Sequence, residues 1–273
     1  MEAYTGFAEI YDLFMDDVPY EEWGGYLAGL LREYQVEDGI VLELGCGTGK
    51  MTRYLARAGY DMIGIDNSEE MLQVAQEAST YVEDPCQDPN GNTGEPKEIL
   101  YLLQDMRELE LYGTVRAVVS VCDSINYILE EEELLQVFCL VDNYLDPGGV
   151  FIFDLNTCYK YREVLGEATI CENREEGSFL WENYYDKTTG INQYDMTFFV
   201  KAQETGSGGE SLYRRFEETH FQRGYELTQV QALLGQAGME VAAVYDAFTH
   251  APPQEDSERV YVVARECRKT DKK

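Results

Sequence analysis

Three glycines at two-residue spacing, Gly45, Gly47 and Gly49, stand between a hydrophobic run at 41–44 and a helical pattern that begins at Lys50. Because glycine has no Cβ, a turn of this composition lets a ligand approach the backbone closely. A turn that leads into a helix N-terminus also presents backbone N–H groups and the positive end of the helix dipole. The chemistry expected here is the binding of a nucleotide or a carboxylate.

The residues around the glycines select among nucleotide-binding turns. A dinucleotide fingerprint that starts at Gly45 needs glycine or alanine at position 50, where the chain has lysine. A phosphate loop needs glycine at position 44 and serine or threonine at position 51, where the chain has Leu44 and Met51. What remains is the pattern acidic-x-G-x-G-x-G, with Glu43 as the acidic residue.

A second carboxylate stands at the end of the next hydrophobic run. Residues 62–65 predict a strand, and Asp66 follows it directly. A carboxylate at the tip of a second strand can hydrogen-bond both hydroxyls of a ribose. Glycine turns alone are common in α/β proteins that bind nothing, but the turn, Glu43 and Asp66 together favour a nucleoside site.

Four segments in order resemble class I S-adenosylmethionine-dependent methyltransferases. They are Glu43–Gly49, Gly64–Leu72, Gln104–Met106 and Leu145–Gly149, the last followed by a strand at 150–153. The resemblance covers roughly residues 36–158 and 226–266. It implies S-adenosylmethionine as the cofactor and methyl donor, with S-adenosylhomocysteine as the product, and it does not name the acceptor.

The resemblance also implies roles for residues of the donor site. The glycines admit the methionine end of the donor, with Glu43 holding the turn or reaching the amino group through water. Asp66 binds the ribose, and Asp105 with Met106 contacts the adenine, although Asp105 fits equally as the N-cap of a helix expected at 106–110. The residues expected to bind the cofactor are Tyr4, Tyr11, Tyr20, Glu43, Gly45, Cys46, Gly47, Gly49, Asp66, Asn67, Met71, Asp105, Met106 and Cys122.

The tyrosines in this set belong to an N-terminal helical cap expected at about 1–35. Small-molecule methyltransferases that the chain resembles fold such a segment over the donor pocket, where an aromatic face attracts a sulfonium cation. Packing in the core is the alternative for these rings.

No residue is assigned as catalytic, and four are candidates: Asp123, Asn126, His220 and Tyr11. Residues 115–121 predict a central parallel strand, and 122–127 follow at the sheet edge where α/β proteins bind ligands. Asp123 and Asn126 are predicted either to orient a ligand or to cap the helix expected at 130–144. Histidine can take up a proton near neutral pH, although a lone histidine on an alternating strand, such as His220, is more often a structural hydrogen-bonder.

The elements that must position these residues predict a Rossmann-like, doubly wound α/β sheet of seven strands, the last one antiparallel, with an inserted antiparallel β lid. Between residues 160 and 224 the pattern alternates with period two, which favours strands at 168–173, 178–186, 191–202 and 212–222. We expect a discontinuous core at 1–158 and 226–266, the lid at 160–224 and a tail at 267–273. The insertion resembles the substrate lid of small-molecule methyltransferases, and a structural or dimerising sheet is the alternative.

The charge of the chain bears on its partners. The 52 acidic and 21 basic side chains give a net charge of −31, which is expected to repel DNA and RNA. Residues 122–127 also lack the motif Asn/Asp-Pro-Pro-aromatic of amino-methyltransferases that act on nucleic-acid bases. We therefore expect methyl transfer to N, O or C of a small molecule, as a monomer or a dimer. The alternatives are an RNA-modifying methyltransferase and a non-catalytic protein that binds S-adenosylmethionine.

Other features of the composition bear on compartment and metals. Seven cysteines without a C-x-x-C pair predict reduced thiols, and with only two histidines no metal site is expected. No apolar run reaches the roughly 18 residues of a membrane span, and the N-terminus lacks the character of a secretion signal. We expect a cytoplasmic protein that does not bind membranes.

Overall fold

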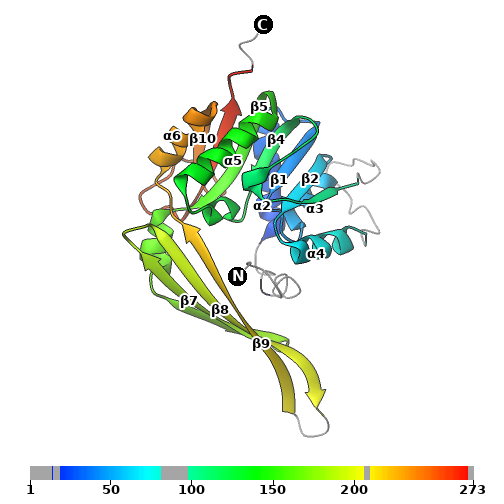
Figure 1. Cartoon of the computed structure of the whole chain (residues 1–273), viewed down its shortest axis with the longest axis vertical. Helices are drawn as coiled ribbons and strands as arrows, with labels where there is room; N and C mark the ends of the chain where they lie inside the picture. The colour runs from blue at the N-terminus through cyan, green and yellow to red at the C-terminus, as the bar shows by residue number, and fades with distance from the viewer. Residues whose placement is uncertain (1–13, 15–18, 81–97, 206–209, 270–273) are drawn as a thin grey trace.

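Two β-sheets organise the chain (Figure 1). The computed structural model describes Phe14 and residues 19–80, 98–205 and 210–269. The larger sheet has seven strands in the order β10-β11-β5-β4-β1-β2-β3, and the smaller sheet has four in the order β6-β7-β8-β9. The strands of the larger sheet are β1 (Ile40–Leu44), β2 (Asp61–Asp66), β3 (Leu100–Leu103), β4 (Val115–Ser120), β5 (Leu145–Asn156), β10 (Met239–Asp246) and β11 (Arg259–Glu266).

The last strand, β11, runs antiparallel to both of its neighbours, β5 and β10, whereas β1 to β5 pair in parallel. This confirms the predicted seven-stranded sheet with its last strand antiparallel. The helices are α2 (Tyr20–Glu33), α3 (Lys50–Arg57), α4 (Glu69–Thr80), α5 (Glu131–Tyr144) and α6 (Leu227–Ala237), with short 3-10 turns η1 (Met106–Glu108) and η2 (Ser124–Tyr127) and a π-helical turn η3 (Lys160–Leu165).

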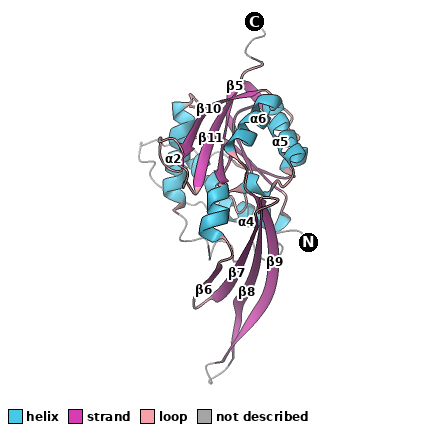
Figure 2. Cartoon of the chain, turned by 90° about the vertical axis from the view of Figure 1, so that its left-hand side faces the viewer, coloured by secondary structure: helices cyan, strands magenta, loops and turns pink. Residues whose placement is uncertain are grey.

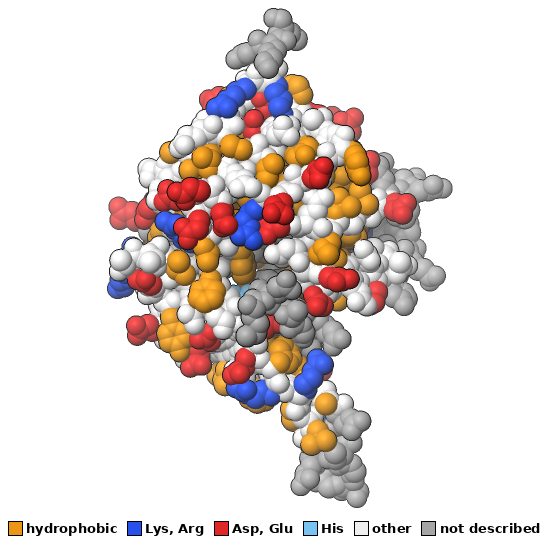
Figure 3. Space-filling view, viewed as in Figure 1, with side chains coloured by type: hydrophobic (Ala, Val, Ile, Leu, Met, Phe, Trp, Pro, Cys, Tyr) orange, Lys and Arg blue, Asp and Glu red, His pale blue; other side chains and the backbone are white. Residues whose placement is uncertain are grey.

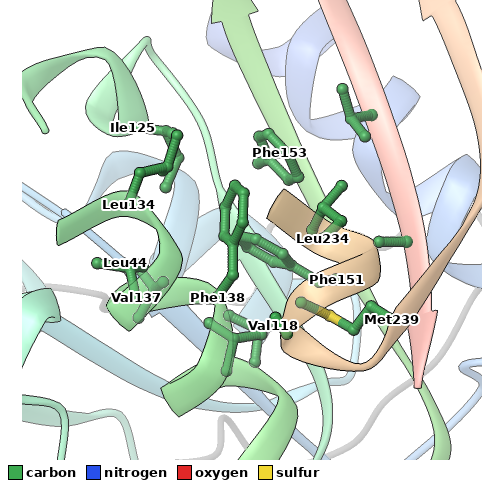
Figure 4. Close-up of a cluster of buried hydrophobic side chains, with 14 of the residues drawn as sticks. Leu44, Val118, Ile125, Leu134, Val137, Phe138, Phe151, Phe153, Leu234 and Met239 are labelled. Carbon is green, nitrogen blue, oxygen red and sulfur yellow. The ribbon is translucent and has the colours of Figure 1, made fainter. Parts of the chain in front are cut away.

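Helices cover both faces of the larger sheet (Figure 2). Because successive strand side chains point to opposite faces, the apolar run of β4 supplies two cores. Val118 points to the core shared with α5 and α6, and Val119 to the core shared with α2 and α3. Phe138 of α5 packs against the stacked rings of Phe151 and Phe153 of β5, at centroid distances of 6.0 and 5.6 Å (Figure 4). Among the described residues no helix is both long and apolar enough to cross a membrane.

Local sequence explains where several elements begin and end. The α6 helix begins with a capping box between Glu226 and Gln229, and it ends at Gly238, which is left-handed with φ +113°. Residues 146–149 form an irregular stretch within β5, between the pairs Val115–Leu145 and Ala117–Val150. One prediction was wrong here, because the helix expected at 106–110 is only the 3-10 turn η1.

The smaller sheet confirms the predicted antiparallel insertion. It extends away from the larger sheet (Figure 1), and its strands are β6 (Thr169–Asn173), β7 (Gly177–Asp186), β8 (Ile191–Thr205) and β9 (Glu210–Arg223). One face, called here the inner face, carries the buried Phe198, against which Phe14 packs at a centroid distance of 6.0 Å. The same face carries buried polar groups where β9 approaches the larger sheet, namely Asn183, Asn192, Glu218, His220 and Gln222.

Candidate active site

The glycine turn follows β1, lies beside the carboxyl end of β2 and leads into α3. Its three glycines all have positive φ, between +51° and +72°, in the left-handed region that glycine enters without strain. Cys46 N–H donates to the carbonyl of Ile65 over 2.9 Å, so the turn is tied to the neighbouring strand. Gly47 N–H donates to Oδ2 of Asp66 over 2.8 Å. The turn and the carboxylate at the tip of β2 therefore form one hydrogen-bonded unit.

Two of the glycines offer a matched pair of substitutions. A Cβ at Gly45 would lie 2.7 Å from Oγ of Ser124, whereas a Cβ at Gly47 meets no atom within 4 Å. Alanine at either position costs about 1–2 kcal/mol for its left-handed backbone. We expect Gly45→Ala to lose about 1–3 kcal/mol more, because Ser124 must move. Urea unfolding of both variants measures the difference, and equal losses would contradict the close approach.

Packing against neighbouring elements explains why residue 49 is glycine. It is the N-cap of α3, and a Cβ there would lie 2.5 Å from the hydroxyl of Tyr101 and 3.0 Å from Cβ of Ala75. It therefore packs against β3 and α4 and does not line the cavity described below. The expected contact of Gly49 with the ligand stays a prediction.

Glu43 lies beneath the turn with only 2% of its surface exposed. Its Oε2 accepts a short hydrogen bond from Oγ1 of Thr52 on α3. Burial raises the pKa of Glu43 to about 8, and the nearby charge of Asp66 adds to the rise. The side chain thus joins the end of β1 to α3 in an environment that favours its neutral form.

Both carboxylate oxygens of Asp66 accept backbone hydrogen bonds. Beside the bond from Gly47, Oδ1 accepts from Ser68 N–H over 2.9 Å. Burial raises the pKa of Asp66, and the backbone donors oppose that rise because they stabilise the charged form. Asp66 therefore fixes the turn and also borders the cavity.

Asp105 is the N-cap of η1, which is one of its two predicted roles. Its Oδ1 accepts from the backbone N–H of Arg107 over 2.8 Å. The guanidinium of Arg107 donates to the same carboxylate and also to Glu133 of α5 over 2.9 Å. The hydrogen bond from this guanidinium, more than any other contact, lowers the pKa of Asp105.

One cavity gathers these groups at the carboxyl edge of the larger sheet. It brings together eleven of the residues expected from sequence, which are Tyr20, Glu43, Gly45, Cys46, Gly47, Asp66, Asn67, Met71, Asp105, Met106 and Cys122. Tyr4 and Tyr11 lie outside the described residues. Sequence reasoning missed nine further lining residues, which are Thr48, Lys50, Met51, Gln104, Arg107, Val121, Ser124, Tyr127 and Ile128. Most of the nine directly adjoin predicted ones in the chain, and that adjacency was the available signal.

Comparisons with known proteins place this chain in a family. A family model described as "Methyltransferase domain" matches residues 41–149. YqeM of Bacillus subtilis (strain 168), whose name places it among the methyltransferases, is 33% identical over 266 residues, with 97% of this chain and 98% of that protein covered. The crystal structure of an S-adenosylmethionine-dependent methyltransferase from Clostridium acetobutylicum ATCC 824 superposes with a TM-score of 0.80 at 28% identity, covering 97% of this chain and 99% of that one. This chain belongs to the S-adenosylmethionine-dependent methyltransferases.

A more distant relative adds a named acceptor. The dTDP-3-amino-3,4,6-trideoxy-alpha-D-glucopyranose N,N-dimethyltransferase of Streptomyces venezuelae is 24% identical over 238 residues, covering 86% of this methyltransferase and 90% of that enzyme.

The cavity fits the cofactor of the family. The open space beside Gly47 leaves the turn accessible, and Asp66 and Asp105 offer acceptor oxygens on neighbouring strand ends. Met71, Met106 and Ile128 supply apolar surface of the kind that an adenine ring packs against. The ring of Tyr20 also lines the cavity, with the ammonium group of Lys50 4.8 Å from its centroid. The face of this ring thus attracts the lysine cation, and the same attraction would act on the sulfonium of a bound donor.

The end of β4 in this methyltransferase is held by buried charges. Cys122 and Asp123 have φ of 58° and 55°, a left-handed backbone that costs energy outside glycine. Their N–H groups converge on the fully buried carboxylate of Asp154, over 3.1 and 2.8 Å. Arg259 bridges Asp154 and Asp123, with 2.7 Å between Nη2 and Oδ1 of Asp123.

Two candidate catalytic residues, Asp123 and Asn126, form hydrogen bonds with other elements of the fold. Asp123 accepts hydrogen bonds from Arg259 and from Nε2 of Gln222, the latter over 2.6 Å, and it does not line the cavity. Asn126 donates to the carbonyls of Asn156 and Arg223, over 3.1 and 2.8 Å, and accepts from Asn156 N–H. Their side chains join η2 to β5, β9 and β11, and their contact with a ligand stays a prediction. The alternative, that they cap α5, was wrong, because its N-cap is Glu130.

His220 lies behind the cavity wall. It is 1% exposed and is separated from the cavity by Tyr127, whose hydroxyl lies 3.2 Å from Nδ1 of the imidazole. The other ring nitrogen, Nε2, lies 3.0 Å from Oε2 of Glu218. The candidate base is therefore one side chain removed from the cavity.

Proposed function

We propose that this enzyme transfers a methyl group to N, O or C of a small-molecule acceptor held between the donor pocket and the inner face of the β6–β9 sheet. The observation that carries the proposal is the contact between Tyr127 and His220, because Tyr127 lines the pocket and His220 belongs to β9. The pocket and the smaller sheet thus share a wall. In this reading residues 160–224 form the lid, and inserted segments of this kind often carry specificity.

The distribution of charge supports a small molecule over a nucleic acid. The chain carries a net charge of −31, and on the face in Figure 3 the Lys and Arg side chains lie interspersed among Asp and Glu. Nucleic-acid affinity depends on cations that displace phosphate counterions. The named acceptor of the Streptomyces venezuelae relative, an amino sugar nucleotide, also supports a small-molecule acceptor.

The protein's contribution to this reaction is mainly alignment. When bound, S-adenosylmethionine supplies an activated methyl group on a sulfonium, so the residues must hold the acceptor in line and exclude water. Proximity and orientation can contribute roughly 7–11 kcal/mol to such a step. The bond from Nε2 of Gln222 to Asp123 ties the lid to the sheet edge. Within the lid, the hydroxyls of Tyr161 and Tyr194 donate to Oε1 of the same Gln222, over 2.9 and 2.6 Å, and hold its side chain in place. A fixed lid favours a pre-formed acceptor site.

In the donor pocket we assign the ribose to Asp66, the adenine to Asp105 and Met106, and the sulfonium end to Tyr20. The glycine turn admits the methionine end of the donor, with Glu43 supporting the turn from below. Each assignment rests on the position of the residue around the cavity.

The ribose assignment predicts that Asp66→Ala weakens the binding of S-adenosylhomocysteine by about 1–3 kcal/mol, because a hydroxyl pair loses its charged partner. Isothermal titration measures the affinity. Asp61→Ala, at the exposed opposite end of β2, is the matched control and should bind as the wild type does. Since Asp66 also holds Gly47 and Ser68, Asp66→Asn tests the charge with less disturbance of the turn. Unchanged affinity in both Asp66 variants would refute the assignment.

A screen with methyl-labelled donor tests the function itself. Fractionated small-molecule extracts, purified RNA and DNA are offered separately, and label is expected to enter a small-molecule fraction. Labelled RNA would favour an RNA-modifying enzyme. Tight donor binding without label in any fraction would favour a non-catalytic binding protein.

A further inference from the structure

Three side chains form a line from the lid to the donor pocket. Glu218 and His220 stand two residues apart on β9 and so share the inner face of the sheet, where both are buried. His220 joins the Glu218 carboxylate through Nε2, over 3.0 Å, and the Tyr127 hydroxyl through Nδ1, over 3.2 Å. The rings of Tyr127 and His220 meet edge to face at 5.9 Å. Only Tyr127 of the three lines the cavity.

The partners of His220 determine which ring nitrogen carries the proton. An ionised carboxylate can only accept, so the nitrogen that faces Glu218 must donate, which places the proton on Nε2. Nδ1 of the neutral ring then has a lone pair, and the Tyr127 hydroxyl must donate to it. The opposite tautomer would set the Nε2 lone pair against the carboxylate. A hydroxyl whose hydrogen is directed at Nδ1 is an acceptor for every other group that approaches it.

We propose that Glu218 and His220 fix the Tyr127 hydroxyl as a hydrogen-bond acceptor for the substrate, so that the enzyme methylates a neutral amine or a hydroxyl group that carries a proton. This inference rests on the proposed function and narrows its acceptor class. Tyr127 is the catalytic residue in this scheme, since it touches the acceptor. His220 and Glu218 are positioning residues.

The proton released in the methyl transfer moves along the same three side chains. The acceptor's nitrogen or oxygen forms its bond to the methyl carbon while the carbon–sulfur bond breaks, and the electron pair of that bond goes to sulfur. The acceptor's proton passes to the Tyr127 oxygen as the tyrosine's own proton moves to Nδ1 of His220. The positive charge lost at sulfur reappears on an imidazolium beside the Glu218 carboxylate. After the product leaves, Nδ1 of the imidazolium returns a proton to the Tyr127 oxygen as the tyrosine's hydroxyl proton passes to water in the cavity, which restores the enzyme.

The first test reads the tautomer without any acceptor. The chain has only two histidines, so the imidazole ¹⁵N resonances of a labelled sample are assigned with a single His250→Gln variant. We expect His220 in the form with its proton on Nε2, and a shift of its Nδ1 resonance in Tyr127→Phe. His250, which is exposed beside Glu33, is the internal reference. A proton on Nδ1 of His220 would overturn the proposal.

The second test uses a fixed probe panel with methyl-labelled donor. Half of the probes carry a hydrogen on the nucleophile (primary and secondary aliphatic amines, phenols and sugar hydroxyls), and half lack one (tertiary amines, pyridines and thioethers). We expect methylation only in the first half. Tyr127→Phe should lower kcat by about 10²–10⁴-fold, the range of proton-transfer catalysis, and His220→Gln should lower it less. In both variants the affinity for S-adenosylhomocysteine should change by less than about threefold. Tyr112→Phe, at a fully exposed ring, is the matched control and should keep the wild-type kcat.

The outcomes separate this inference from the proposed function. Methylation of tertiary amines, pyridines or thioethers at comparable rates, or a Tyr127→Phe enzyme with unchanged kcat, would overturn the inference while the proposed function stands. If the enzyme binds the donor but methylates neither the panel nor the extracts, the proposed function fails. The tautomer of His220 then still tests the hydrogen-bond arrangement of Glu218, His220 and Tyr127.

Discussion

Replacement of Arg259 by methionine is expected to lower the free energy of unfolding by about 3–5 kcal/mol, the usual cost of leaving a buried charge without its partner. The Arg259 side chain is 12% exposed, and its guanidinium contacts the fully buried Asp154 and the partly buried Asp123. Burial raises the pKa of Asp154, and the charge of Arg259 is the main opposing effect. Without Arg259, two carboxylates face each other at the end of β4.

The loss should depend on pH in a defined direction. Removing Arg259 raises the pKa of Asp154 further above its ordinary value, so the variant gains a proton that relieves the repulsion as the pH falls. The destabilisation is therefore largest at alkaline pH and smallest at acidic pH. Urea unfolding over a pH series measures it.

Two further variants separate the charge from the packing of the long side chain. Arg265→Met, at the other end of β11, removes an arginine that lies 6.0 Å from the ring of Tyr34 and should cost less than about 1 kcal/mol. Arg259→Met combined with Asp154→Asn should recover part of the loss, because the buried charge is gone while an acceptor oxygen remains for Cys122 and Asp123. A loss in Arg259→Met as small as in Arg265→Met would contradict the account.

The donor side of the site was predictable because local sequence determines it. A glycine that must adopt positive φ and a carboxylate that ends a strand are both properties of a few adjacent residues, which is why Gly45, Gly47 and Asp66 lie around the cavity as expected. Gly49 shows what local sequence does not contain. A side chain there would strike Tyr101 and Ala75, which come from other elements, and the spacing of the glycines gives no sign of this packing.

The acceptor side depends on partners far apart in the chain. Asp123 could be placed at the sheet edge from sequence, but its partners Gln222 and Arg259 lie 99 and 136 residues away. His220 was recognised as a candidate base, yet nothing in the local pattern indicates that Tyr127 stands between it and the pocket. The strands of the smaller sheet were predictable because alternation is local, whereas the π-helical turn η3 has no periodic signal of its own.

Glu43→Gln is expected to make the protein more stable than the wild type, by an amount that grows with pH. The pKa of Glu43 is raised from 4.5 to about 8 in the folded protein. Between these values the folded state holds a proton that the unfolded chain has released. The wild type therefore loses about 1.4 kcal/mol of stability per pH unit from this group as the pH rises through the window.

Glutamine cannot ionise and still offers an oxygen to the Thr52 hydroxyl, so the variant should escape this loss. Its advantage over the wild type should be near zero at pH 4.5 and about 4 kcal/mol at pH 8, as measured by urea unfolding. Glu240→Gln, at an exposed carboxylate on β10, is the control and should follow the wild-type profile. Wild-type and Glu43→Gln stabilities that run parallel from pH 5 to 8 would show that Glu43 is ionised throughout. A buried carboxylate anion would then lie beneath the glycine turn, and its negative charge would repel the neighbouring carboxylate of Asp66, to which we assign the ribose.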